Sequence, residues 1–129
     1  MINHEAAIPG WNLALRLFLE LASFAAFGWA GWELAGGGIV GVLLAVVLPV
    51  AAMAAWGTFA VVGDPSRSGK APVPVPGWLR LVVEYAVFGG ACVLLAAAGA
   101  VVLAVVLAAL NVLHLAFAIP RTRWLLRQG

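Results

Sequence analysis

The sequence predicts an all-α membrane protein, a four-helix transmembrane bundle built from two parallel helical-hairpin repeats. Two observations support this prediction. The chain of 129 residues is 65% hydrophobic and only 9% charged, whereas a soluble domain carries about 25% charged residues. The motif R-L-x-x-E-x-A-x-F begins at Arg16 and again at Arg80, and each copy opens a long apolar segment. A single transmembrane domain is expected to fill residues 1–129.

Four apolar segments are long enough to cross a bilayer, which takes about 20 residues per helix. The expected spans are residues 13–34, 39–62, 78–98 and 100–119. Asn12 is a candidate N-cap for the first helix. An uncharged turn at residues 35–38 and a bend at Gly99 would close the two hairpins. Pro120 is expected to end the last helix, and the apolar tail after it is a candidate for the membrane interface.

The basic residues predict the orientation of the chain. They lie in the loop at residues 63–77, in Arg67 and Lys70, and in the C-terminal tail, in Arg121, Arg123 and Arg127. Because short cytoplasmic loops carry the excess of Lys and Arg, this loop and both termini are expected on the cytoplasmic side of the membrane. Two spans separate the copies of the motif, so both copies point the same way, as in a parallel repeat.

Each motif places a charge pair one helical turn apart inside apolar sequence. The pairs are Arg16 with Glu20 and Arg80 with Glu84. An i,i+4 pair stabilises a helix by only about 0.2–0.5 kcal/mol, which cannot offset roughly 2.5–3.5 kcal/mol for a charge at the membrane centre. The arginines have two explanations: they snorkel to lipid phosphates, or they pair with the glutamates. The glutamates either link the first and third spans or move protons or cations.

Pairing across the repeat has a definite geometry. If the first and third spans are neighbours, each arginine reaches the glutamate of the other copy diagonally, over about one turn or 5.4 Å of rise. One cluster would then neutralise all four charges.

Further polar residues fall at a matching depth and form a candidate polar layer: Trp56, Thr58, Asn111 and His114. His114 is expected to be a neutral packing residue, and Asn111 to hydrogen bond across helices. Cys92 is the one cysteine, so no internal disulfide can form. No nucleophile pattern or metal-binding cluster accompanies these residues, so neither a cofactor nor an enzyme activity is expected.

Two functions from different classes remain open. The first is a non-enzymatic structural or interaction protein of the membrane, whose small residues at four-residue spacing would permit a homodimer or a membrane-protein partner. The second is a small proton-coupled transporter of cationic or lipophilic molecules that uses its membrane carboxylates. The lipid bilayer is the expected surrounding, and a net charge of only +2 gives no indication of nucleic acid.

The motifs resemble those of a known family. Asn12 to Leu21, Trp56-Gly57-Thr58-Phe59, Leu79 to Glu84 with Phe88-Gly89, and Asn111 are similar to the YrdB-like family. That family consists of small four-span bacterial membrane proteins with no established biochemical function. The resemblance covers nearly all of the chain, which differs in its longer central loop. It implies four spans and a bacterial cytoplasmic membrane, and it supplies no substrate and no catalytic residue.

Overall fold

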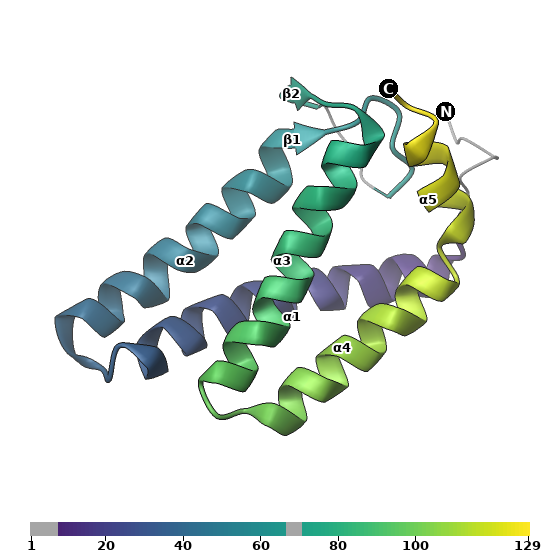
Figure 1. Cartoon of the computed structure of the whole chain (residues 1–129). Helices are drawn as coiled ribbons and strands as arrows, with labels where there is room; N and C mark the ends of the chain where they lie inside the picture. The colour runs from purple at the N-terminus through teal and green to yellow at the C-terminus, as the bar shows by residue number, and fades with distance from the viewer. Residues whose placement is uncertain (1–7, 67–70) are drawn as a thin grey trace.

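The computed structural model describes residues 8–66 and 71–129, which fold into five helices and one short strand pair (Figure 1). The helices are α1 (Gly10–Leu34), α2 (Gly38–Thr58), α3 (Gly77–Ala97), α4 (Val101–Ala116) and α5 (Ile119–Leu126). The strands β1 (Phe59–Ala60) and β2 (Val73–Pro74) pair in parallel, with Phe59 opposite Val73. The predicted all-α class is confirmed.

Three of the described helices are long and apolar enough to cross a membrane, namely α1, α2 and α3. The fourth candidate consists of α4 and α5 together, which are bent by 72° at the break between them. At about 1.5 Å per residue, the 16 residues of α4 extend about 24 Å, which is shorter than the roughly 30 Å of bilayer hydrocarbon. The structure therefore has three or four candidate spans.

The helices form two hairpins that meet along α1 and α3. α2 packs mainly on α1, α4 packs mainly on α3, and α1 and α3 contact each other. Both hairpin turns lie at one end of the molecule, and the start of α1, both strands and α5 lie at the other (Figure 1). The turn of the first hairpin has positive φ at Gly36, Gly37 and Gly38, a backbone conformation that glycine adopts without steric cost.

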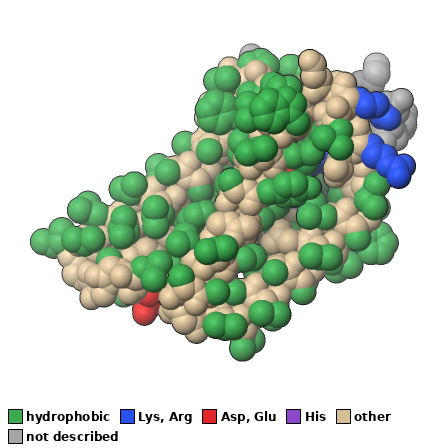
Figure 2. All heavy atoms as spheres, in the orientation of Figure 1, with side chains coloured by type: hydrophobic (Ala, Val, Ile, Leu, Met, Phe, Trp, Pro, Cys, Tyr) green, Lys and Arg blue, Asp and Glu red, His purple; other side chains and the backbone are tan. Residues whose placement is uncertain are grey.

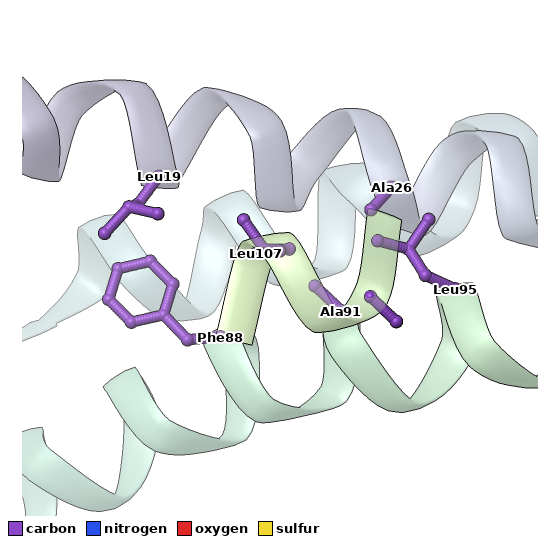
Figure 3. Close-up of a cluster of buried hydrophobic side chains, with 7 residues drawn as sticks. Leu19, Ala26, Phe88, Ala91, Leu95 and Leu107 are labelled. Carbon is purple, nitrogen blue, oxygen red and sulfur yellow. The ribbon is translucent and has the colours of Figure 1, made fainter. Parts of the chain in front are cut away.

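The hydrophobic core lies where α1, α3 and α4 converge. Figure 3 shows Leu19 and Ala26 of α1 facing Phe88, Ala91 and Leu95 of α3 and Leu107 of α4. Alanine side chains allow helix backbones to approach closely, which is how membrane helices gain packing energy. The surface is unlike that of a soluble protein, because many large hydrophobic side chains are exposed and hydrophobic side chains are spread over the whole visible face (Figure 2).

The second and fourth predicted spans were too long. α2 ends at Thr58 and not at residue 62, because the chain turns into β1. α4 ends at Ala116, before Pro120, which instead lies in the first turn of α5. Proline is favoured there, since the first amide groups of a helix have no partner within it.

The C-terminal tail, which the sequence suggested for the membrane interface, packs against the protein with two of its apolar residues. Trp124 and Leu125 of α5 are buried against Val61 and Leu81 in a second core cluster. The backbone N–H of Gly77, the first residue of α3, donates to the carbonyl of Gln128 at 2.6 Å. α5 therefore packs back onto the start of α3.

The charged surface residues gather at the two ends of the molecule. Figure 2 shows Lys and Arg side chains at the end that carries α5, and an acidic side chain near the opposite end. Arg67 and Lys70, on which part of the orientation prediction depends, lie outside the described residues.

Candidate functional site

Glu84 lies at the centre of a buried charge cluster. Its carboxylate accepts hydrogen bonds from three arginines, each on a different helix: Arg16 of α1 at 2.7 Å, Arg80 of α3 at 2.8 Å and Arg121 of α5 at 2.7 Å. Glu84 is 1% exposed. Bidentate guanidinium–carboxylate bonds are among the strongest side-chain hydrogen bonds in proteins, so this one carboxylate joins three helices.

Arg121 extends the cluster into the central loop. While it donates to Glu84, its Nε and Nη2 atoms donate to the two carboxylate oxygens of Asp64, at 2.9 and 2.6 Å. Asp64 also accepts from the backbone N–H and the hydroxyl of Ser66. The arginine–carboxylate cluster therefore comprises Arg16, Arg80, Arg121, Glu84 and Asp64.

Arg80 also caps the C-terminal end of α2. Its Nη1 atom donates to the carbonyl oxygens of Trp56 and Phe59, at 2.5 and 2.7 Å. The last carbonyls of a helix have no partner within it, and here a buried guanidinium supplies one. The Arg80 and Arg16 guanidiniums lie 4.6 and 5.1 Å from the centroid of the Trp56 ring, which stabilises both cations in the apolar interior.

His114 connects α4 to the cluster. Arg16 approaches the Nε2 atom of His114 at 3.3 Å. Because arginine can only donate, Nε2 is the acceptor, and the ring carries its proton on Nδ1. That proton is donated to the Oδ1 atom of Asn12, and the Asn12 amide donates to the His114 backbone carbonyl at 3.2 Å. The expected neutral histidine therefore fits the geometry, whereas the Asn12 N-cap prediction was wrong.

The diagonal pairing is present in only one of its two directions. Arg16 reaches Glu84 across the repeat, but Arg80 binds the glutamate of its own helix and not Glu20. Glu20 lies at the edge of the cluster, where it accepts from the Trp56 indole at 2.7 Å and lies 3.9 Å from Arg16. The snorkelling explanation is wrong, because Arg16 and Arg80 are 2% and 1% exposed.

The predicted polar layer divides into two parts. Trp56 and His114 contact the cluster. Thr58 is half-buried, and its hydroxyl makes no hydrogen bond to the described residues. Asn111 lies apart and bonds within its own helix, where its Nδ2 atom donates to the Leu107 carbonyl at 2.9 Å. The expectation that Asn111 bonds across helices was therefore wrong.

The sequence did not point to Arg121 or Asp64 as cluster members, or to Asn12 as the partner of His114. Arg121 was counted with the tail arginines that set orientation. One signal was available in the sequence. Asp64 follows the second expected span and Arg121 follows the fourth, so both were expected near the same membrane boundary as the motif charges. Opposite charges at the same depth are candidates for a pair.

The charges of the cluster are balanced once Glu20, at its edge, is included. Its three arginines face Glu84, Asp64 and the nearby Glu20, so positive and negative groups are equal in number. Buried ion pairs tolerate low dielectric only when their hydrogen bonds are satisfied. Among the described residues, no group of His, Cys, Asp and Glu could hold a metal ion. This arrangement fits the joining of helices, and it leaves Glu84 with no side open to a ligand.

Asp64 lies in the loop outside the helices, and its protonation should affect stability. Burial raises its pKa, but the hydrogen bonds and charge of Arg121 outweigh burial and hold the pKa below the usual 3.8. A carboxylate with a lowered folded-state pKa stabilises the fold above its unfolded pKa, and this contribution is lost as the pH falls through the folded-state value. We therefore expect the melting temperature to decrease as the pH is lowered beyond about 4. Asp64→Asn should be less stable at pH 7 and should show a flatter acid limb in the same titration.

A double-mutant cycle can test the contact between α1 and α3. Arg16→Met and Glu84→Gln should together cost less than the sum of the two single changes, because either single change already removes the whole Arg16–Glu84 contact. The matched cycle of Arg80→Met with Glu20→Gln should be close to additive, since these two side chains do not pair. Thermal stability in detergent micelles is the measurement. Additivity in the first cycle would contradict the observed contact.

The comparisons with known proteins agree with the resemblance in the motifs. A family model described as a protein of unknown function (DUF2568) matches residues 14–112. The chain is 38% identical over 117 residues to the uncharacterized protein YrdB of Bacillus subtilis (strain 168). The aligned region covers 91% of this chain and 94% of that protein. No solved structure matches it. The chain therefore belongs to the YrdB-like DUF2568 family, whose function is unknown.

Proposed function

We propose that this protein is a non-enzymatic structural or interaction protein of the bacterial cytoplasmic membrane, in which the arginine–carboxylate cluster fixes the two hairpins against each other. The observation that supports this role is the saturation of Glu84 by three arginines from three helices. A coupling carboxylate in a transporter must exchange partners in each cycle. Glu84 is instead held in place by groups that are permanently charged.

The two hairpins are proposed to be a duplicated unit related by an axis along the membrane normal. The motif repeat supports this relation, as does the direct packing of α1 on α3. The two copies differ in role: Glu84 lies at the centre of the cluster, whereas Glu20 lies at its edge. The apolar outer faces are proposed to contact lipid and, in a homodimer or with a membrane-protein partner, another helix.

The competing hypothesis is a small proton-coupled transporter, and Glu20 is the residue on which it would depend. Glu20 is half-buried, and its side chain is 19% exposed. However, Arg16 lies one turn away, and a fixed cation competes with a cationic substrate for the same carboxylate. Because the Glu20 side chain is partly exposed, a cation could reach it, and this alternative can be tested by replacing Glu20.

Proteoliposomes distinguish the two functions. We expect no proton release when tetraphenylphosphonium is added to the reconstituted protein, and no change with Glu20→Gln. The structural proposal is overturned if the cation drives proton release that Glu20→Gln abolishes. Empty liposomes control for leakage of the lipophilic cation.

The orientation gives a separate prediction. Fusions of a cytoplasm-active reporter at Gly129 or after Pro74 should be active, and a fusion at Gly37 should be inactive, because both hairpin turns lie at the end opposite α5 (Figure 1) and basic residues favour the cytoplasm. Alkaline phosphatase fusions at the same sites should give the reverse pattern. A periplasmic Gly129 would contradict the proposed orientation.

A further inference from the structure

A pocket on the side of the bundle contains polar groups that the charge cluster does not use. It lies between α3 and α4, with a volume of about 250 Å³, and its lining includes Tyr85, Phe88 and Cys92 from α3 and Asn111 and Leu115 from α4. Tyr85 is 45% exposed, so the pocket opens at the surface that faces lipid. Most of the lining is apolar, and Asn111 is its most deeply buried polar residue.

Asn111 presents an unpartnered acceptor. The residue is 8% exposed, and its Oδ1 atom has no hydrogen-bond partner among the described residues. The amide orientation is fixed, because Nδ2 donates to the Leu107 carbonyl and an oxygen in that place would face another oxygen. A buried acceptor without a partner destabilises the fold, because its lost hydrogen bond to water is not replaced. The site therefore favours a ligand that brings a hydrogen-bond donor.

The position of the pocket restricts the ligand further. Asn111 lies five residues before the end of α4, or about 7.5 Å along the helix. It is therefore farther than the charge cluster from the α5 end of the molecule and nearer the middle of the proposed span. A charged headgroup at that depth would be costly, whereas a neutral hydroxyl would not. The volume is below the roughly 300–1,000 Å³ of pockets that enclose whole small ligands. The pocket can hold one end of a molecule whose remainder stays in the bilayer.

We propose that this pocket binds the hydroxyl end of a neutral lipid alcohol, which donates its proton to Oδ1 of Asn111. Apolar side chains such as Phe88 and Leu115 contact the adjoining hydrocarbon. Oδ1 itself is buried under the lining, so entry of the hydroxyl requires a side chain to move. The half-exposed ring of Tyr85 lines the pocket, and exposed side chains generally change rotamer within nanoseconds.

Cys92 offers a direct test, because it lines the pocket and is the one cysteine of the chain. The full-length protein in nanodiscs of phosphatidylcholine is treated with N-ethylmaleimide, and alkylation of Cys92 is followed by mass spectrometry. The probes are dodecanol, its methyl ether and dodecyl phosphate, at equal concentrations in the bilayer. Dodecanol should slow alkylation and saturate at a concentration about fivefold lower than the ether, the factor that corresponds to one hydrogen bond of about 1 kcal/mol. Dodecyl phosphate should protect no better than the ether.

Asn111→Leu should abolish the difference between dodecanol and its ether while leaving the fold at least as stable, because it removes an unpartnered acceptor. If that variant does not fold, Gly89→Leu serves instead. A Cβ at Gly89 meets no atom within 4 Å, so the leucine can occupy the pocket and should likewise remove the advantage of dodecanol. The proposal is overturned if alcohol and ether protect Cys92 equally, if the phosphate protects as well as the alcohol, or if Asn111→Leu retains the difference.

Discussion

Glu84→Gln is expected to be the most destabilising single change in the cluster. It replaces the carboxylate that three arginines share, and the amide that remains can offer only one acceptor oxygen. Arg16 and Arg80 then lose their main counter-ion while they remain buried. Breaking a buried ion pair costs roughly 3–5 kcal/mol, and here more than one pair is broken. Unfolding in mixed micelles with increasing sodium dodecyl sulfate measures the loss.

The first copy of the motif supplies a matched control for this prediction. Glu20→Gln makes the same chemical change at the equivalent position of the other motif. The Trp56 indole can still donate to the amide oxygen, and the side chain is 19% exposed, so its loss should be about 1 kcal/mol or less. Equal losses for Glu20→Gln and Glu84→Gln would mean that the two carboxylates carry equal weight, contrary to the observed contacts.

The difference between these two glutamates was not visible in the sequence. The motif copies are equivalent along the chain, so symmetry predicted two diagonal pairs. In the structure Arg80 is occupied by the carbonyls of Trp56 and Phe59, because α2 ends at Thr58 and leaves them free. A helix end that is set by tertiary contacts therefore decided which glutamate became the centre of the cluster.

Local sequence predicted the features that depend on neighbouring residues. Hydropathy and the repeated motif placed α1 and α3 well, since an apolar run with a charge pair has few alternatives in a bilayer. The contacts of Arg121 and Asp64 join residues far apart in the chain, and nothing local distinguishes a tail arginine that binds a carboxylate from one that sets orientation. The break between α4 and α5 was missed for a similar reason: Pro120 was interpreted as a helix end, although proline also begins helices.

Gly77→Ala should release α5 from the start of α3. A Cβ at Gly77 would overlap the backbone carbonyl of Leu125, and the φ of Gly77 is not positive, so the glycine is required by close approach and not by backbone conformation. Leu125 is fully buried and cannot move without opening the second core cluster. Overpacking costs typically about 1–3 kcal/mol, and the upper end is expected because the obstacle is backbone.

The measurement is the rate at which trypsin cleaves after Arg123, within α5, in detergent micelles. Gly77→Ala should raise this rate severalfold, because α5 must leave its packed position to enter the protease. Gly89→Ala in the same helix is the control: its Cβ would meet no atom within 4 Å, and alanine favours a helix over glycine by about 1 kcal/mol, so cleavage should stay unchanged or slow. If Gly77→Ala left both cleavage and stability unchanged, the packing of α5 on α3 would be looser than the contact between Gly77 and Leu125 requires. The position of Arg121 between Glu84 and Asp64 would then have to be held by its ion pairs alone.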